Sequence, residues 1–192
     1  MNFRILAAAL AAATLSAGAQ AAVYTDDFNA DGLGLNAVPA GWSVANGTVD
    51  VIGTGFFELL PGNGNYIDLD GSSNQAGVLS HLVTGVADGT YSVSFQLAGN
   101  QRGAGNDVVD VTFGGTTQTY TLADNAPLAT YTLTTSVSGG SVGLSFYNHG
   151  GDNQGAILDN VSVSAVPEPA GIALMLAGLG FVGFSAKRRK LG

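Results

Sequence analysis

Strict alternation of apolar and polar side chains is the feature that most limits how this chain folds. Residues 90–97 alternate throughout, and the same period of two recurs at residues 130–137 and 141–146. The apolar positions of the first stretch are Tyr91, Val93, Phe95 and Leu97. Because successive side chains of a strand point to opposite faces, this pattern predicts strands with one buried face. No window of residues 22–165 has a helical period, so the alternation favours an all-β domain.

Glycine-containing turns separate the alternating stretches. Asn46-Gly47, Gly114-Gly115 and Ser138-Gly139-Gly140 each predict a hairpin between the strands that flank them. Further predicted strands are Val23–Phe28, Tyr66–Leu69, Gly77–Val83 and Gly155–Ser164. About nine to eleven short strands in one domain favour an antiparallel two-sheet sandwich, and among these a jelly roll. By analogy with such folds, we expect the first and last strands to lie side by side.

The charges are distributed unevenly along the chain. Five of the six basic residues lie before residue 22 or after residue 165, which leaves Arg102 alone between them. The same range, 22–165, holds thirteen of the fourteen acidic residues, so its formal charge is −12. A surface of this sign repels nucleic acid, which excludes nucleic-acid binding, and it attracts divalent cations. We expect Arg102 to form an ion pair with one of the carboxylates, with contact to a ligand as the alternative.

The amino terminus has the pattern of a secretory signal peptide. Arg4 precedes an apolar stretch, and Ala19-Gln20-Ala21 fits the small-residue pattern of a cleavage site. We therefore expect passage through the secretion translocon and a cut by signal peptidase after the last of these residues. The chain then divides into a signal peptide at 1–21, an exported domain at 22–165 and a carboxy-terminal segment at 166–192.

The carboxy-terminal segment combines a short tag, an apolar run and a basic end. Val166-Pro167-Glu168-Pro169 is followed by 17 uncharged residues, Ala170–Ala186, and then by Lys187-Arg188-Arg189-Lys190. As a helix the run reaches about 25 Å, slightly short of a hydrocarbon core of about 30 Å, and basic side chains at its end extend to the interface. The run is apolar on all sides, so it predicts a single transmembrane helix in the inner membrane. The basic end stays cytoplasmic, and the exported domain lies outside.

This three-part segment resembles the PEP-CTERM sorting signal of Gram-negative bacteria that produce exopolysaccharide. The resemblance rests on the tag, the glycine-bearing run and the basic cluster as they stand in this chain. It implies that an exosortase-type enzyme cleaves near the tag, so that the membrane helix is a transient anchor. The destination that it implies is the cell surface or the extracellular matrix of a biofilm.

Asp27, Asn29 and Asp31 indicate a calcium site. They alternate before Gly32, as oxygen ligands do in the first half of a calcium loop. An EF-hand is excluded, because Val38 stands where its bidentate Glu belongs and no flanking helices are predicted. The alternative is an Asx-rich turn without a metal.

Asp159 is the candidate fourth calcium ligand. By alternation it shares the face of Ile157, Val161 and Val163, where a carboxylate must be paired or bound to a metal. Residues 158–163 resemble the closing strand of many carbohydrate-binding jelly rolls, in which a neighbouring acidic residue joins a structural calcium site. The alternative is a strand-edge residue that caps a loop.

One polar loop is a candidate for binding a ligand. Asn148, His149, Asp152 and Asn153 follow Tyr147, and polar side chains of these types orient sugar hydroxyls. An ordinary polar loop between two strands is the alternative. Because no motif around the two histidines supports a catalytic nucleophile, the loop does not predict an enzyme.

Asp68 and Asp70 share one side of a predicted strand. Paired carboxylates serve acid–base chemistry in glycosidases, but a strand end followed by a turn also produces this pattern. Together with residues 97–103, the stretch resembles a recurrent jelly-roll domain of PEP-CTERM proteins. Trp42 fits a buried core aromatic better than a platform for a sugar.

The sequence therefore predicts an exported, non-enzymatic protein of the cell surface or extracellular matrix. One alternative is a carbohydrate-binding module that acts as an adhesin or matrix linker, with extracellular polysaccharide as its partner. A more remote alternative is a glycan hydrolase, which the paired carboxylates alone favour.

Overall fold

The computed structural model describes residues 21–167 together with residues 176, 178 and 179. The predicted signal peptide and almost all of the predicted transmembrane run therefore lie outside the described residues. No helix of bilayer-spanning length and hydrophobicity occurs among the residues that the structure describes. The strands are β1 (Ala22–Asp26), β2 (Ser43–Ala45), β3 (Asp50–Gly53), β4 (Asn65–Asp68), β5 (Val78–Thr84), β6 (Gly89–Ala98), β7 (Asp107–Phe113), β8 (Thr116–Leu122), β9 (Ala129–Val137), β10 (Ser141–Asn148) and β11 (Ile157–Ala165).

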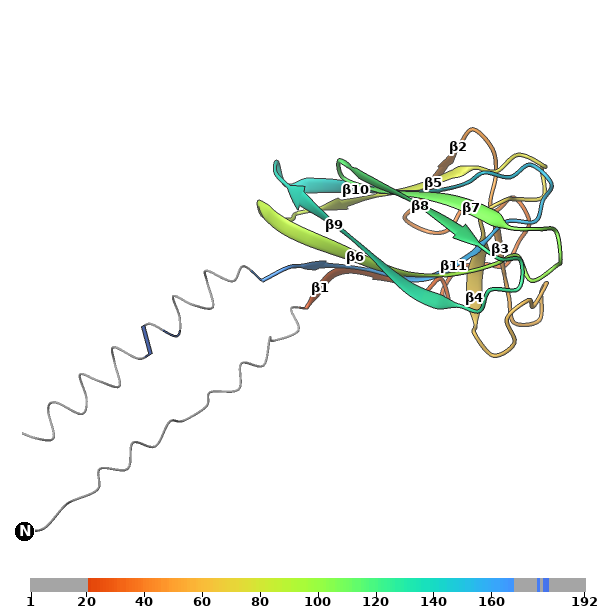
Figure 1. Cartoon of the computed structure of the whole chain (residues 1–192), viewed down its shortest axis with the longest axis horizontal. Coiled ribbons are helices and arrows are strands. Elements are labelled where there is room, and N and C mark those ends of the chain that lie inside the picture. The colour runs from red at the N-terminus through yellow and green to blue at the C-terminus, as the bar shows by residue number, and fades with distance from the viewer. Residues whose placement is uncertain (1–20, 168–175, 177, 180–192) are drawn as a thin grey trace, which may run out of the picture.

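The strands form two antiparallel sheets that face each other (Figure 1). The first sheet has the order β3-β4-β11-β6-β9, and β1 also pairs with β11. The second has the order β2-β5-β10-β7-β8. The predicted all-β sandwich is confirmed, and so is the pairing of the first strand with the last, which places Ala22 opposite Ser164.

Two apolar clusters hold the sandwich together. The main cluster fills the space between the sheets, and Phe28, Phe95 and Phe146 are among its fully buried side chains. Trp42 belongs to this cluster, as expected from the sequence. A smaller cluster lies on the outer face of the first sheet, around Tyr66. Both clusters consist of residues between 24 and 165, so the exported domain contains the whole described core.

Only one of the three predicted hairpins is correct. Gly114-Gly115 joins β7 to β8, and Phe113 pairs with Thr116 across the turn. The other two predictions are wrong, because the turns at 46–47 and 138–140 each carry the chain from one sheet to the other. Gly47 is required for a different reason: a Cβ there would overlap the backbone at residues 75–76.

The sandwich has two ends of different character. Both β1 and β11 reach the near end, where the described chain enters at Ala22 and leaves after Ala165. The far end is formed by the loops after β4 (69–77), β6 (99–106) and β10 (149–156), on the opposite side in Figure 1. Ile157 at the start of β11 pairs with both Asp68 and Ala98, which brings these three loops together.

Candidate binding site at the far end

Asp68, the last residue of β4, lies at the centre of the far end. Its Oδ2 pairs with Arg102 Nη2 at 2.5 Å, and its Oδ1 accepts hydrogen bonds from the N–H groups of Gly155 (2.9 Å) and Asp70 (3.1 Å). The ion pair expected for Arg102 is thus confirmed. Burial raises the pKa of Asp68 to about 7, and the nearby guanidinium only partly opposes this shift. A single buried carboxylate therefore ties all three loops together.

Asp70 holds the loop after β10 in place. Its side chain is fully buried, and Oδ2 accepts hydrogen bonds from the N–H groups of Gly151 (2.6 Å) and Asp152 (3.1 Å). A Cβ on Gly150 or Gly155 would overlap Asp70, so only glycine lets the loop close over it. Oδ1 has no hydrogen-bond partner among the described residues, and burial raises the pKa of this carboxyl.

Two further buried aspartates fix the neighbouring segments. Asp107 Oδ2 accepts hydrogen bonds from the backbone (2.9 Å) and side-chain (3.0 Å) N–H groups of Asn100, and burial raises its pKa to about 6. Asp50 Oδ1 accepts from the N–H groups of Asn36 (2.6 Å) and Ser72 (3.1 Å). Its Oδ2 accepts from Ser72 Oγ at 2.7 Å. The far end is therefore a rigid polar framework rather than a set of loose loops.

Two small hollows open on this framework. The first, which we call the Phe57 hollow, has a volume of about 250 Å³. It is lined by Leu35, Asp50, Ile52, Phe57, Asp68, Ser72, Arg102 and Asn153. The second, which we call the polar hollow, has a volume of about 210 Å³ and lies between the loops after β6 and β10. It is lined by Asn100, Ala104, Asn106, Asp107, Asn148, His149, Gly150, Gly151, Asp152 and Gln154.

Phe57 is the most unusual side chain at the far end. It is 61% exposed, although phenylalanine is normally buried. Its φ of 48° lies in the left-handed region, where a bulky residue is an outlier that is associated with functional sites. Phe56, which contacts the outer cluster on the first sheet, meets the Phe57 ring edge-on at a centroid distance of 5.0 Å. Phe56 is therefore anchored in the outer cluster, and it supports the Phe57 ring, which is exposed to solvent.

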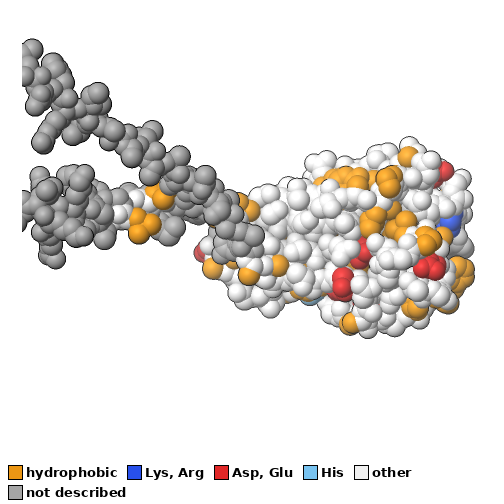
Figure 2. Space-filling view, turned by 90° about the horizontal axis from the view of Figure 1, so that it is seen from below, with side chains coloured by type: hydrophobic (Ala, Val, Ile, Leu, Met, Phe, Trp, Pro, Cys, Tyr) orange, Lys and Arg blue, Asp and Glu red, His pale blue; other side chains and the backbone are white. Residues whose placement is uncertain are grey.

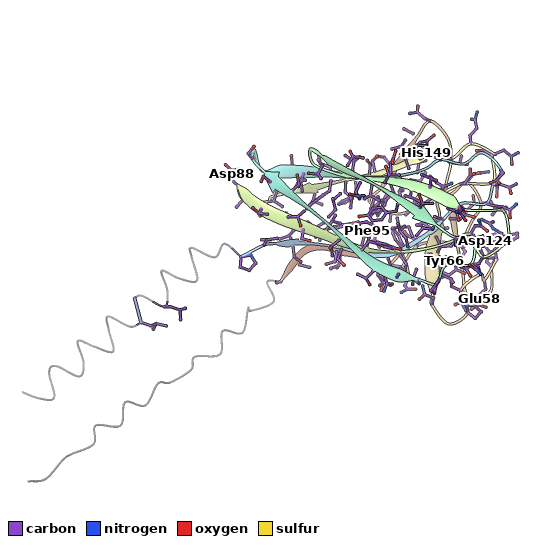
Figure 3. The ribbon with its side chains drawn as sticks, in the orientation of Figure 1. Glu58, Tyr66, Asp88, Phe95, Asp124 and His149 are labelled. Atoms are coloured by element: carbon purple, nitrogen blue, oxygen red, sulfur yellow. The ribbon has the colours of Figure 1, made fainter. Side chains whose placement is uncertain are left out.

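Figures 2 and 3 show the setting of these groups. Figure 2 shows hydrophobic and acidic side chains close together on the rounded part of the domain, away from the near end. In Figure 3, Glu58, Tyr66, Asp124 and His149 lie toward the far end, whereas Asp88 marks the near end and Phe95 lies between the sheets. The polar framework and both hollows thus lie away from the junction with residue 166.

Hollows elsewhere on the domain lack this combination of groups. The outer face of the second sheet has a hollow of about 360 Å³ around Gly143, lined mainly by serine, glycine and threonine. Its one exposed large side chain is Leu82. The ring of His81, which also lines this hollow, stacks on Tyr24 with ring centroids 4.0 Å apart. We therefore regard the far end as the stronger candidate.

The four residues of the predicted ligand loop divide between the two hollows. Asn148, His149 and Asp152 line the polar hollow, and Asn153 lines the Phe57 hollow. Asn148 is buried, and its Oδ1 accepts a hydrogen bond from the N–H of Ala156 at 3.3 Å. The exposed side chain of His149 pairs with Asp110 instead of standing free: Nε2 and Oδ2 are 2.7 Å apart. Ligand contact by these four residues stays a prediction.

The residues of the predicted calcium loop face separate partners. Asp27 Oδ1 accepts the N–H of Asn29 (3.1 Å), whereas Asn29 Oδ1 accepts the N–H of Asn65 (2.9 Å). Asp31 Oδ1 accepts the N–H of Ala40 at 2.8 Å. Across the described part of the chain, no three His, Cys, Asp or Glu side chains converge as a metal site. The four residues therefore do not form a single ligand set in this arrangement.

Asp159 is buried, but its predicted orientation is wrong. A register shift after Asp159, where Asn160 has a φ of 50°, breaks the alternation within β11. Val161 consequently joins the main core, whereas Asp159 lies outside it and accepts a hydrogen bond from Asn63 Nδ2 at 2.6 Å. Burial raises its pKa to about 6, and the charge of Asp27 adds to this shift. Of the other three predicted ligands, Asp27 is thus the one whose charge affects Asp159.

Phe57, Ser72, Asp50 and Asp107 are site residues that sequence reasoning missed. A pair of aromatic residues inside a glycine-rich stretch, 53–64, is the one available signal. It does not reveal which ring is buried. Ser72 follows Asp70-Gly71, and only the fold brings it to Asp50, 22 positions away along the chain.

Known structures similar to this chain are carbohydrate-binding modules. The CBM22-1 xylan-binding domain from Paenibacillus barcinonensis Xyn10C is 16% identical, with a TM-score of 0.49, and the match covers 78% of this chain and 97% of that one. A family 35 carbohydrate-binding module from Clostridium thermocellum is 14% identical, with a TM-score of 0.49 and coverage of 74% and 98%. A CBM35 from Cellvibrio japonicus Abf62 is 19% identical, with a TM-score of 0.46 and coverage of 69% and 92%. The likeness is confined to the fold.

No curated protein matches the chain. A family model described as the PEP-CTERM protein-sorting motif matches residues 165–190, which include the tag and the whole basic cluster. This match confirms the resemblance seen in the sequence. The chain is an exported protein that carries a PEP-CTERM sorting motif behind an all-β sandwich domain.

Proposed function

We propose that the exported domain is a non-enzymatic module that binds extracellular polysaccharide through its far end. The observation that carries this proposal is the Phe57 hollow, where an exposed aromatic ring stands beside Arg102, Ser72 and Asn153. Sugar rings present apolar C–H faces and a rim of hydroxyls. An aromatic face with a few fixed polar groups is complementary to both.

The position of the far end suits a surface protein. The chain leaves the sandwich at the near end, where Val166 N–H donates to Thr90 O at 2.8 Å. A ligand at the far end is therefore remote from the segment on which an exosortase-type enzyme acts. Sorting and binding do not compete for the same surface, so the domain binds its ligand both before and after processing.

The carboxylates of the far end favour binding over hydrolysis. Glycosidases need two carboxyl groups that flank the scissile bond, one of which protonates the leaving group. Asp68 and Asp70 are instead buried and hydrogen-bonded to loop N–H groups, and Asp68 is also paired with Arg102. These contacts give both residues a structural role, and this favours binding over hydrolysis.

Polysaccharide binding by the exported domain tests the proposal. The domain, residues 22–165, is mixed with extracellular polysaccharides, including the exopolysaccharide of the producing cells, and bound protein is measured in a pull-down. We expect binding that Phe57→Ala weakens and that Leu82→Ala leaves unchanged. Leu82 is a matched control because it is 58% exposed but lies on the outer face of the second sheet.

The outcomes separate three functions. If no polysaccharide binds, the domain is a surface or matrix protein without a carbohydrate ligand, and the proposal is wrong. If Leu82→Ala abolishes binding and Phe57→Ala does not, the ligand lies on the sheet face. Turnover of a glycan that Asp68→Asn abolishes would establish the hydrolase instead.

We also propose a structural calcium ion near Asp27 and Asp159. The observation that favours it is that Asp159 is buried, with a pKa raised by burial and by the charges of Asp27 and Asp26. Calcium prefers six to eight oxygen ligands, which neutral groups such as amides supply as readily as carboxylates. Asn29 and Asp31 would have to exchange their present hydrogen bonds to take part.

The proposed route follows from the two chain ends. The protein enters the secretion translocon, loses residues 1–21 to signal peptidase and is held in the inner membrane by its carboxy-terminal helix. An exosortase-type enzyme then removes this anchor, and the domain reaches the cell surface or the biofilm matrix. Mass spectrometry of the mature carboxy terminus tests this route, and an intact Lys190 in the mature protein would contradict it.

A further inference from the structure

Resting on the proposed function, we infer that the Phe57 hollow accepts one uncharged sugar residue and excludes acidic ones. Three properties of this hollow support one uncharged sugar residue as its ligand: its charge balance, its hydrogen-bonding groups and its size.

The charge balance of the hollow leaves no net positive charge for an acidic sugar. Arg102 is the one Lys or Arg residue of the exported domain, and its charge is already opposed by Asp68 at 2.5 Å. Asp50 also lines the hollow. The three groups together carry a charge of −1 when both carboxyls are ionised, and of zero when Asp68 is protonated. A uronic acid carboxylate would therefore meet repulsion from Asp50 and from the domain's overall charge of −12.

The free hydrogen-bonding groups of the hollow suit hydroxyls. A guanidinium has five N–H donors. Among the described residues the Arg102 guanidinium has one side-chain partner, Asp68, so donors are left over for a ligand. Ser72 Oγ donates to Asp50 and keeps its lone pairs as acceptors. A sugar hydroxyl both donates and accepts, whereas a carboxylate only accepts.

Phe57 supplies the face on which the sugar ring packs. Its ring is exposed and is held by the edge-on contact with Phe56. The backbone at Phe57 is left-handed, a conformation that is strained for a bulky residue, although its ring is 61% exposed. Contact with a ligand accounts for an exposed aromatic ring kept in this position.

The size of the hollow limits how much of a polysaccharide it holds. Its volume of about 250 Å³ is below the range of about 300–1,000 Å³ for sites that enclose drug-sized ligands. We therefore expect it to take a single terminal or branching residue of a chain.

Binding to defined polysaccharides tests the ligand class. The exported domain is run in affinity gels that contain neutral polymers (dextran, galactomannan, arabinoxylan) or acidic ones (alginate, polygalacturonate), at low and high salt. We expect retardation by at least one neutral polymer, unchanged by salt, and none by the acidic polymers. Phe57→Ala is expected to weaken binding about tenfold, Phe57→Tyr to preserve it, and the methyl glycoside of the bound sugar to compete.

Every other outcome contradicts one particular part of the proposal. Retardation by acidic polymers alone, lost at high salt, contradicts the uncharged ligand and leaves polysaccharide binding intact. Neutral binding that Phe57→Ala does not change places the ligand elsewhere. Competition only by long oligosaccharides contradicts the single-residue site. If no polymer in either set or from the producing cells binds, the proposed function itself fails. Because Phe57 is exposed, its variants are expected to fold, which circular dichroism checks.

Discussion

The loops at the two ends of the sandwich are held in place by different interactions. At the near end, the turn between β9 and β10 relies on Gly139 and Gly140 with positive φ, and exposed Asp88 accepts the N–H of Gly139 at 3.0 Å. At the far end, buried aspartates hold the loops, and burial raises the pKa of two of them to about 6 or 7. A buried carboxylate costs stability unless it is paired and hydrogen-bonded. The buried aspartates of the far end therefore lower the stability of the domain while they fix the shape of its loops, as is common at binding surfaces.

The largest difference between the ends is expected when their ionic groups are removed. Arg102→Ala leaves the buried Asp68 carboxyl without its ion-pair partner, so we expect a loss of about 3 kcal/mol in the free energy of unfolding. Asp88→Ala removes one exposed hydrogen bond and should cost no more than about 0.5 kcal/mol. Urea unfolding of both variants measures the difference, and equal losses would show that the two ends do not differ as described.

The far end also makes stability depend on pH. The pKa of Asp68 is about 7 in the folded protein and 3.8 as the reference value, and that of Asp107 is about 6. The folded state therefore binds these protons more tightly than the unfolded chain. Their contribution is fully present below pH 3.8 and is lost as the pH rises through 6 and 7. These two groups are therefore expected to make the protein less stable at pH 8 than at pH 4, by several kcal/mol.

Asp68→Asn isolates the contribution of Asp68 to the pH dependence of stability. The amide does not titrate, so the difference in stability between acid and alkaline conditions should shrink, whereas Asp88→Asn at the near end should leave it unchanged. Chemical unfolding across the pH range measures both. A wild-type protein whose stability rises steadily with pH would contradict the assignment of the raised pKa values to the far end.

Calcium is expected to have a smaller effect. If it binds only the folded domain, a hundredfold excess over its dissociation constant adds about 2.7 kcal/mol, or a rise of several degrees in Tm. Asp159→Asn should remove this rise, and Asp88→Asn should not. An identical Tm in calcium and in chelator would show that the sites around Asp27 and Asp159 hold no calcium.

Phe57→Gly is the smallest and most specific change. Glycine adopts the left-handed conformation at no steric cost, so we expect stability to rise by about 0.5 kcal/mol after the lost contact with Phe56 is allowed for. The same change removes the aromatic face and should weaken polysaccharide binding. Thermal unfolding and affinity gels on the same sample measure the two effects. A clear loss of stability would mean that Phe57 supports the fold and is not kept for a ligand.

The sequence predicted the strands much better than their partners. Alternation reports which residues face the core, so the span of β6 and its buried face could be predicted from residues 90–97. It does not report which sheet a strand joins, so Asn46-Gly47 predicts a hairpin although β2 and β3 belong to different sheets. A register shift that follows Asp159 breaks the alternation at Asn160, a residue type that tolerates the left-handed conformation but does not by itself predict a shift.

The candidate site was less predictable than the fold for physical reasons. Asp68 and Asp70 have the residue types of an exposed turn, and only the glycine contacts of the loop after β10 bury them. Phe56 and Phe57 are chemically identical neighbours, so residue type cannot tell that Phe56 packs against the outer cluster whereas Phe57 is exposed. The ion pair of Arg102 was predictable, because one cation among thirteen carboxylates of the exported domain readily finds a partner.

The position of β11 gives the domain a mechanical property. It lies inside the first sheet, with β1 and β4 along one edge and β6 along the other, and it runs from the far end to the exit of the chain. In the proposed function, the carboxy-terminal segment is anchored and a polysaccharide is bound at the far end, so a pull between the two would run parallel to this strand. Its hydrogen bonds to both neighbours are then loaded in shear and must break together instead of opening one by one. The fold thus places a strand that is hydrogen-bonded on both sides between the proposed anchor and the proposed load.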